Sequence, residues 1–228
     1  MTREDFIKAL PDLVKEYQPL PEVLALIGSI DLLMIIGATG VGKTAIIKRL
    51  GIPYVVTDTT RPIRPEEING SDYFFRTDYE QLISEIRERK FVQVNIFSTG
   101  DFYGTRASAY PEVGLAVYAV VSNLIPQMRE LGFSETTSAF IVPPTFLEWM
   151  DRMDRHDVEK DQLAQRLQEA KRSFNFALND SQTHLIYNEN LNKAVEQTKA
   201  LINGQPDPER EAQARQAAEA IYKELSFV

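Results

Sequence analysis

The first residues with recognisable chemistry lie between 37 and 44, where GATGVGKT fits the pattern G-x-x-x-x-G-K-[ST]. Glycines at these positions let backbone N–H groups turn toward phosphate oxygens with no side chain in the way. Lys43 adds a positive charge for the β- and γ-phosphates, and the Thr44 hydroxyl is suited to binding Mg²⁺. The predicted ATP and phosphate ligands in this loop are Gly37, Ala38, Thr39, Gly40, Val41, Gly42, Lys43 and Thr44. The loop alone does not distinguish a kinase from an ATPase or a GTPase.

A second group of side chains suited to phosphate binding lies in and after TDTTRPIRPEEINGSDYFF, residues 57–75. Arg61 and Arg64 are three residues apart, and the proline that follows each of them stiffens the segment. Tyr73 and Tyr103 add phenolic hydroxyls, so these four side chains could hold a second phosphate group through bidentate and phenolic hydrogen bonds. The alternative is a solvated loop whose arginines pair with the two glutamates that follow them.

Alternating strands and helices are predicted around these motifs. Leu32–Ile36 is typical of a buried strand and Ala45–Leu50 of a helix start, so the phosphate loop joins a strand to a helix. The further strand candidates are Tyr54–Val56, Phe91–Phe97, Leu115–Val121, Ala139–Val142 and His184–Tyr187. The helices expected between them are Asp78–Lys90, Asn123–Leu131, Phe146–Arg155, Val158–Phe176 and Leu191–Asn203. This alternation predicts a parallel sheet covered on both faces by helices.

Helices are also predicted at both ends of the chain. The residues that recur at helical spacing near the start are Phe6, Leu10, Leu13 and Tyr17. Pro11 and Pro21 are expected to interrupt this helical segment. Asp207, followed by a proline, is expected to cap a last helix that ends at Leu225. We expect the apolar stripe of that helix to pack on its own domain.

Composition excludes several classes of function. The 228 residues carry a net charge of −8 and a pI near 5.0, which argues against non-specific nucleic-acid binding, because that function requires a basic face. The absence of cysteine excludes disulfides and thiolate metal sites and suits a reducing compartment. The acidic start MTREDFIKAL is not a secretory signal, and no segment is suited to span a membrane. We therefore expect a cytoplasmic protein that binds neither nucleic acid nor membranes, and the phosphate loop predicts small-molecule nucleotides as its partners.

The chain resembles the guanylate kinase family, whose members transfer the γ-phosphoryl group of ATP to GMP. The motifs that carry the resemblance are the phosphate loop at 37–44, T-T-R-x-x-R…G-x-D-Y-x-F at 59–75, Y-G-T at 103–105, VPP at 142–144 and YNENL at 187–191. The resemblance implies an α/β P-loop kinase fold of three layers, with a parallel sheet, an inserted subdomain that binds the nucleoside monophosphate, and a helical lid. The implied boundaries are 1–30 for an N-terminal helical extension, 31–205 for the kinase-like domain, 57–113 for the insert, 145–175 for the lid and 206–228 for a C-terminal helix.

The resemblance also implies roles for individual residues. The positions that match catalytic cations are Lys43, Arg61, Arg152 and Arg166. Arg155 matches a further lid arginine that binds ATP, and Asn188 matches an asparagine near the adenine of ATP. The positions that match the acceptor site are Thr57, Arg61, Arg64, Tyr73, Gln93, Tyr103, Thr105 and Ser122. ATP and Mg²⁺ are the implied cofactors, with Thr44 as the metal ligand. For Arg152 and Arg155 an ordinary solvated helix face is the alternative.

The sequence departs from the family where the family reads guanine. Gln93 and Ser122 stand in place of a glutamate and an aspartate, whereas Thr57 and Thr105 keep a hydroxyl. Val120 replaces another acid, which lies near the metal and the acceptor. A glutamate accepts hydrogen bonds from both N1–H and the N2 amino group of guanine, whereas glutamine has one acceptor and one donor group. A buried donor left unpaired costs about 1–3 kcal/mol, so we predict less strict base recognition.

Three functions remain open on the sequence. The first is a nucleoside monophosphate kinase, with GMP as the default acceptor. The second is a kinase of the same fold that acts on another phosphorylated small molecule, such as a sugar phosphate. The third is a non-catalytic module with a guanylate-kinase-like fold, against which the intact Gly42, Lys43 and Thr44 argue. The sequence does not indicate an oligomeric state.

Overall fold

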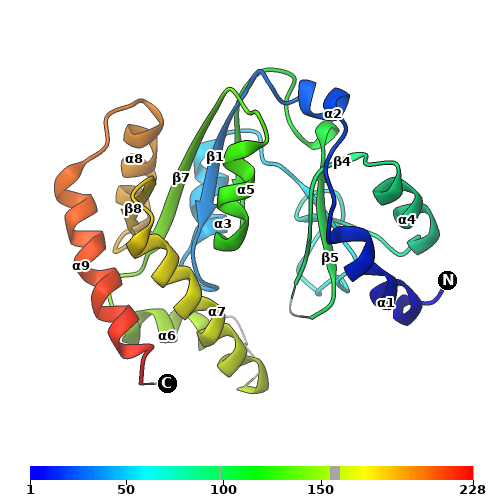
Figure 1. The fold of residues 1–228 in the computed structure, drawn as a ribbon. Helices are drawn as coiled ribbons and strands as arrows, with labels where there is room; N and C mark the ends of the chain where they lie inside the picture. Colours follow the sequence, from blue (N-terminus) through cyan, green and yellow to red (C-terminus); the bar gives the residue numbers. More distant parts are fainter. Residues whose placement is uncertain (98, 155–159, 228) are drawn as a thin grey trace. The chain divides into compact units, whose positions relative to one another are not determined.

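The protein is described by a computed structural model that places residues 1–97, 99–154 and 160–227 (Figure 1). Its contacts divide the chain into two compact units. Unit 1 contains Met1–Asp31, Pro53–Ala116 and Met128–Glu135, and unit 2 contains Leu32–Ile52, Val117–Gln127 and Thr136–Val228. Among the helices of the described residues, none has both the length and the apolar character that a membrane span requires.

The sheet that lies mainly in unit 2 has the order β6-β1-β7-β8. Its strands are β6 (Gly114–Ala119), β1 (Ile30–Ile36), β7 (Glu135–Val142) and β8 (Thr183–Tyr187). β7 and β8 pair in parallel, from Ser138 opposite Thr183 to Val142 opposite Tyr187. In β1 every residue from Leu32 to Ile36 is buried, as a strand covered on both faces requires. The prediction of an α/β fold with a parallel sheet is confirmed.

Helices pack around this sheet. They are α3 (Lys43–Leu50), α5 (Ile125–Glu130), α6 (Phe146–Asp154), α7 (Lys160–Asn179), α8 (Leu191–Ile202) and α9 (Pro208–Glu224), with a 3-10 turn η2 (Ser122–Leu124) before α5. In Figure 1, α3 lies behind the strands and α7 in front of them. Asp207 caps α9 by accepting a hydrogen bond from the Arg210 N–H. The apolar stripe of α9 is buried and the helix packs on β8 and α7, so the prediction for this helix is confirmed.

Unit 1 contains a second sheet that the sequence analysis did not foresee. Its order is β3-β2-β5-β4. The strands are β2 (Thr57–Thr59), β3 (Tyr73–Phe75), β4 (Phe91–Ile96) and β5 (Phe102–Arg106), and a 3-10 turn η1 (Ala107–Ala109) follows β5. β2 and β4 both pair antiparallel with β5, whereas β2 and β3 are parallel. The strand predicted at Phe91–Phe97 therefore belongs to a mixed sheet and not to the parallel one.

The strand predicted at Tyr54–Val56 is wrong. The strand begins three residues later, at Thr57, although Val55 is fully buried. Apolar character predicts burial, but a strand also needs partners for its backbone N–H and C=O groups. β5 offers those partners to Asp58 and Thr59, where the strand forms, whereas Tyr54 takes part in a single-residue β-bridge.

Two N-terminal helices and one internal helix complete unit 1. They are α1 (Arg3–Val14), α2 (Pro21–Ala25) and α4 (Tyr79–Arg87). Thr2 and Asp5 form a capping box at the start of α1. Pro11 does not end this helix, contrary to the prediction, because α1 continues to Val14; Pro21 instead begins α2. The apolar residues shared by α1, α4 and the second sheet are Phe6, Leu10, Tyr17, Leu82, Ile83, Ile86, Phe91, Val94 and Phe102.

Candidate active site

Side chains bind four backbone carbonyl groups of the phosphate loop in unit 2. The hydrogen bonds run from Lys43 Nζ to the carbonyls of Gly37 (2.6 Å) and Ala38 (2.8 Å), from Trp149 Nε1 to that of Thr39 (2.7 Å), and from Asn188 Nδ2 to that of Val41 (2.7 Å). In a planar trans peptide the N–H points away from the C=O. The N–H groups of Gly40 and Gly42 therefore point away from Trp149 and Asn188, and successive N–H groups in a glycine-rich loop are suited to bind an anion.

Gly42 is required at the end of this loop. Its φ is +100°, and a Cβ atom here would lie 2.6 Å from Asn188 Nδ2. The residue therefore makes both the left-handed backbone turn and the close approach of Asn188 feasible. α3 begins at the next residue, so its N-terminal N–H groups and their positive partial charge face the loop.

Lys43 and Thr44 occupy the first turn of α3 with different surroundings. Burial lowers the pKa of Lys43 to about 8, because removing the ammonium group from water penalises its charged form. The Thr44 side chain is exposed. The first turn of the helix thus presents an ammonium group that gains from an anionic partner, next to a hydroxyl that is accessible to a hydrated cation.

Two of the predicted ATP-site residues, Arg152 and Asn188, contact each other, and Asn188 binds the phosphate loop. Asn188 is buried, and its backbone N–H also donates to Val142 O. Arg152 on α6 donates to Glu148 Oε1 (2.6 Å) and to Asn188 O (3.0 Å). The side-chain amide of Asn188, predicted near adenine, is thus engaged with the loop backbone. Arg166 lies half-buried on α7, and the prediction for Arg155 falls outside the described residues.

Three of the predicted base-side residues form one row across the second sheet. Gln93 is opposite Thr105, and Asp58 is opposite Gly104. Continuing that register by one residue places Thr57 opposite Thr105. Residues opposite each other in a sheet share a face, so the three polar side chains lie side by side. We call this the polar face, defined by Thr57, Gln93, Tyr103 and Thr105.

This row of side chains is buried although it is polar. Thr57, Gln93 and Thr105 are 4%, 0% and 0% exposed. Thr105 Oγ1 is 3.1 Å from the hydroxyl of Tyr110, whose pKa is raised by burial. Polar side chains are seldom fully buried unless they form hydrogen bonds. The arrangement is suited to reading the polar edge of a planar ligand.

Arg61 lies in a cluster of aromatic side chains that includes both predicted tyrosines. Its guanidinium lies 5.2 Å from the ring centroid of Tyr73 and 5.5 Å from that of Phe75. The rings of Tyr73 and Tyr103 meet edge to face at 6.0 Å. Because these contacts come from β3, β5 and the segment after β2, the second sheet assembles a cluster that the sequence spreads over more than forty positions.

Glu67 accepts hydrogen bonds from both Arg61 and Arg64. Its two oxygens accept from Arg61 Nη2 (2.6 Å) and from the backbone N–H of Arg64 (2.9 Å). Although burial opposes it, the Arg61 guanidinium holds the pKa of Glu67 below its usual value. The side chain of Arg64 is exposed. The pairing anticipated for a solvated loop thus exists at Glu67, and a phosphate that binds Arg61 would compete with this carboxylate.

Ser122 lies in unit 2, whereas the other predicted acceptor residues lie in unit 1. It begins η2, is buried, and its hydroxyl is 3.3 Å from that of Ser173 on α7. Val120 is also buried, and its N–H donates to Ile35 O of β1. At these two positions, where the family has acids, this chain therefore has an uncharged side chain: a hydroxyl at Ser122 and a buried apolar group at Val120.

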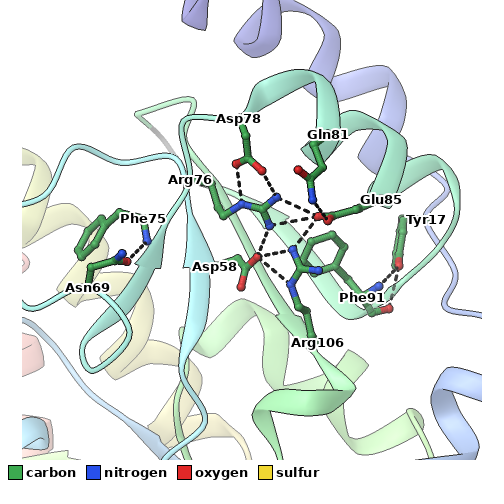
Figure 2. A network of polar contacts seen from close by, with 10 residues as sticks. All are labelled: Tyr17, Asp58, Asn69, Phe75, Arg76, Asp78, Gln81, Glu85, Phe91 and Arg106. Atoms are coloured by element: carbon green, nitrogen blue, oxygen red, sulfur yellow. Dashed lines mark hydrogen bonds and ion pairs between the residues drawn. The ribbon is translucent and has the colours of Figure 1, made fainter.

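Sequence reasoning missed a charged network on the opposite face of the second sheet (Figure 2). Arg76 and Arg106 both donate to Asp58 Oδ2 and to Glu85 Oε2, at distances from 2.6 to 3.1 Å. Asp58 comes from β2, Arg106 from β5 and Glu85 from α4, and Arg76 also binds Asp78. The sequence signal was an aspartate, Asp58, between two threonines, but its burial and its partners depend on β5, which had not been predicted.

A glycine-rich loop between a buried strand and a helix, with a lysine on the first helical turn, defines a P-loop nucleotide-binding protein. The guanylate kinase family model matches residues 29–205. Curated relatives include guanylate kinases of Nostoc sp. (31% identity; 76% of this chain and 89% of that protein) and Thermotoga maritima (29%; 77% and 87%). This chain belongs to the guanylate kinase family.

A solved structure agrees with that assignment at the level of the fold. The crystal structure of guanylate kinase from Anaplasma phagocytophilum aligns with a TM-score of 0.54 and 21% sequence identity, covering 81% of this chain and 89% of that one. The family match begins at residue 29 and ends at residue 205. α1, α2 and α9 therefore lie outside the matched segment.

Proposed function

We propose that this protein transfers the γ-phosphoryl group of ATP to GMP. The observation that carries the proposal is the joint presence of two phosphate-binding groups in one chain of this family. One is the loop of Gly37–Thr44, whose carbonyls are held by Lys43, Trp149 and Asn188, and the other is the cluster of Arg61, Tyr73 and Tyr103. A hydrolase would need only the first group, whereas transfer to a phosphorylated acceptor needs both.

Each phosphate-binding residue has a proposed role in transfer. Lys43 neutralises charge on the transferred phosphoryl group, and the loop N–H groups hold the donor phosphates. Arg61 and Arg64 hold the acceptor phosphate together with the hydroxyls of Tyr73 and Tyr103. The residues proposed to add positive charge from the lid are Arg152, Arg155 and Arg166. Such a reaction depends on positioning and charge neutralisation, and needs little covalent chemistry from the protein.

Mg²⁺ fits the residues present at the loop. Magnesium in kinases is held by one or two protein oxygens together with substrate phosphates. The exposed hydroxyl of Thr44 on the first turn of α3 offers one such oxygen. When bound there, the ion would add to the neutralisation of phosphate charge that Lys43 supplies.

ATP affinity is expected to fall as pH rises above about 8. The pKa of Lys43 is lowered to about 8 by burial, and only the protonated amine attracts the phosphates. Above that pH, binding must take up a proton, so the affinity should decrease by about tenfold per pH unit. Isothermal titration calorimetry with ATP between pH 7 and 10 measures the slope. Lys43→Arg keeps its charge over this range and should show a flat profile; equal slopes in both proteins would contradict the role of Lys43.

Base specificity is the finer part of the proposal. Thr57, Gln93 and Thr105 are proposed to contact the acceptor base, because they form one buried polar row. Ser122, from unit 2, is proposed as a fourth contact. This set contains no carboxylate to accept hydrogen bonds from guanine. Discrimination against other bases should therefore be weaker than in a site that pairs every polar edge of the base.

An ATP-consumption assay with a panel of acceptors tests the function. The panel contains GMP, dGMP, AMP, IMP, UMP, CMP and several sugar phosphates, and kcat/KM is measured for each. We expect turnover of nucleoside monophosphates with GMP preferred by about one or two powers of ten. Turnover of a sugar phosphate without any nucleotide would transfer the assignment to a different acceptor class. Strict specificity for GMP would show that Gln93 reads guanine fully.

Gln93→Glu should increase the preference for GMP over AMP by about tenfold or more. The new carboxylate can accept both guanine N–H donors, and each recovered hydrogen bond of this kind corresponds to about one power of ten. The ratio of kcat/KM values for the two nucleotides is the measurement. Gln205→Glu, the same change at an exposed glutamine after α8 in unit 2, is the control and should leave the ratio unchanged. An unchanged ratio in Gln93→Glu would remove Gln93 from base recognition.

A further inference from the structure

β4 contains an irregularity that decides where Gln93 points. Phe91 is opposite Arg106, whereas Gln93 is opposite Thr105. Two steps along β4 thus correspond to one step along β5, which is the signature of a β-bulge. Side chains alternate along a regular strand, so without the extra residue Phe91 and Gln93 would share a face.

The packing confirms that the bulge separates these two side chains. Phe91 meets the ring of Phe102 edge to face at 5.2 Å, and Arg106 lies over the Phe91 ring at 4.8 Å. A Cβ atom on Gly104 would come within 2.9 Å of both rings. Phe91 is therefore fixed on the face that packs against α1 and α4, and the bulge turns Gln93 to the polar face.

The Tyr17 hydroxyl binds the backbone of β4 at one side of this bulge. It donates to Phe91 O (2.7 Å) and accepts from Phe91 N (2.8 Å), as Figure 2 shows. β4 is the edge strand of its sheet, so these two backbone groups have no further strand to pair with. Burial raises the pKa of Tyr17 to about 12, which keeps the hydroxyl protonated and able both to donate and to accept.

The helix before Tyr17 holds it in place. Phe6 and Leu10 of α1 are completely buried against the apolar residues of α4 and the second sheet. Arg89, after α4, donates to the carbonyl of Gln18, the residue next to Tyr17. All of these contacts lie within unit 1. The N-terminal segment, which precedes the family-matched residues, is thus part of the support of β4.

We propose that Tyr17 is a positioning residue for the acceptor base, acting through the bulge of β4 on the side chain of Gln93. The proposal rests on the proposed function, because it assigns base contact to Gln93. It also assigns a role to the N-terminal segment: this segment fixes the edge strand from which the base is read.

Tyr17→Phe tests this role, since it removes the hydroxyl and keeps the ring that packs with Phe6 and Leu10. The variant should raise KM for GMP and lower the GMP to AMP ratio of kcat/KM by about three- to tenfold, the range expected for one hydrogen bond. KM for ATP should not change. Tyr222→Phe is the matched control, because it removes a hydroxyl that binds Asn175 in unit 2. A merely structural tyrosine would lower thermal stability and leave the nucleotide ratio intact, and that result would overturn the proposal.

A double-mutant cycle shows whether Tyr17 acts through Gln93. In a Gln93→Ala background, Tyr17→Phe should have no further effect on the nucleotide ratio, because the side chain that the bulge directs is gone. Additive effects of the two substitutions would overturn the proposed route.

Hydrogen exchange separates this proposal from the proposed function. In Tyr17→Phe, amides in the Lys90–Val94 segment should exchange about three- to tenfold faster, while those of α4 keep their rates. Unchanged exchange in β4 would overturn the proposal whether or not the protein is active. A wild-type protein without nucleotide turnover would instead refute the acceptor assignment, and with it the base-reading role of Tyr17.

Discussion

Replacing Lys43 with alanine is expected to reduce phosphoryl transfer by about a hundredfold to a thousandfold, with the fold retained. The substitution removes the ammonium group proposed to stabilise the transferred phosphoryl group, and removing one preorganised donor of this kind typically costs that much. The loop should keep its shape, because Trp149 and Asn188 still bind two of its carbonyls. Single-turnover transfer of the γ-phosphoryl group, measured with saturating ATP and acceptor, gives the rate.

The matched control for this variant is Lys48→Ala. Lys48 is an exposed lysine on the same helix, so it loses an equal charge away from the loop. Thermal unfolding of both variants establishes that they are folded at the assay temperature. Transfer at the wild-type rate in folded Lys43→Ala would refute the kinase assignment itself.

Replacing Arg61 with alanine is expected to raise KM for the acceptor, or to lower kcat, by about tenfold or more. A hydrogen bond to a charged group contributes about 1.5–3 kcal/mol, and each 1.4 kcal/mol corresponds to about a factor of ten. ATP binding should change little, because Arg61 is assigned to the acceptor phosphate. Steady-state kinetics with each substrate varied in turn separates the two effects, and Arg64→Ala should behave in the same way.

Glu67 provides a second measurement at the same site. Because its carboxylate already binds Arg61, an acceptor phosphate has to compete with it. Glu67→Gln weakens this ion pair and should lower KM for the acceptor. Arg87→Ala, which removes an exposed arginine of α4, is the control for lost charge in unit 1. Wild-type kinetics in both Arg61→Ala and Arg64→Ala would show that neither arginine binds the acceptor phosphate.

The sequence predicted the parallel sheet and most of its helices correctly, and it failed in the second sheet. β1 and the second half of β7, Ala139–Val142, are apolar runs, so their pattern identifies them locally. β2 and β3 have three residues each, which is too short for a period of two to be recognised. β5 contains Gly104 and few apolar residues, and its role as the central partner of β2 and β4 is a property of pairing across the chain.

The candidate site divides in the same way. The phosphate loop was predictable in full, because a strand, a glycine-rich turn and a helix start meet within one short segment. The grouping of Arg61, Tyr73 and Tyr103 was inferred from residue type and from the resemblance, and the structure supplies its geometry. The involvement of Trp149 with the loop could not be predicted, since its partner is Thr39, 110 residues earlier.

The sequence alone therefore determined the donor phosphate loop, because backbone freedom at glycine, a lysine and a hydroxyl act within a few consecutive residues. Only the tertiary structure decided how the acceptor side is built. Gln93 lies opposite Thr105, Glu67 accepts from the guanidinium of Arg61, and Tyr17 binds Phe91, 74 residues away. Each of these contacts depends on strand register and helix packing between distant segments, and a one-residue change of register would turn Gln93 to the opposite face of its sheet.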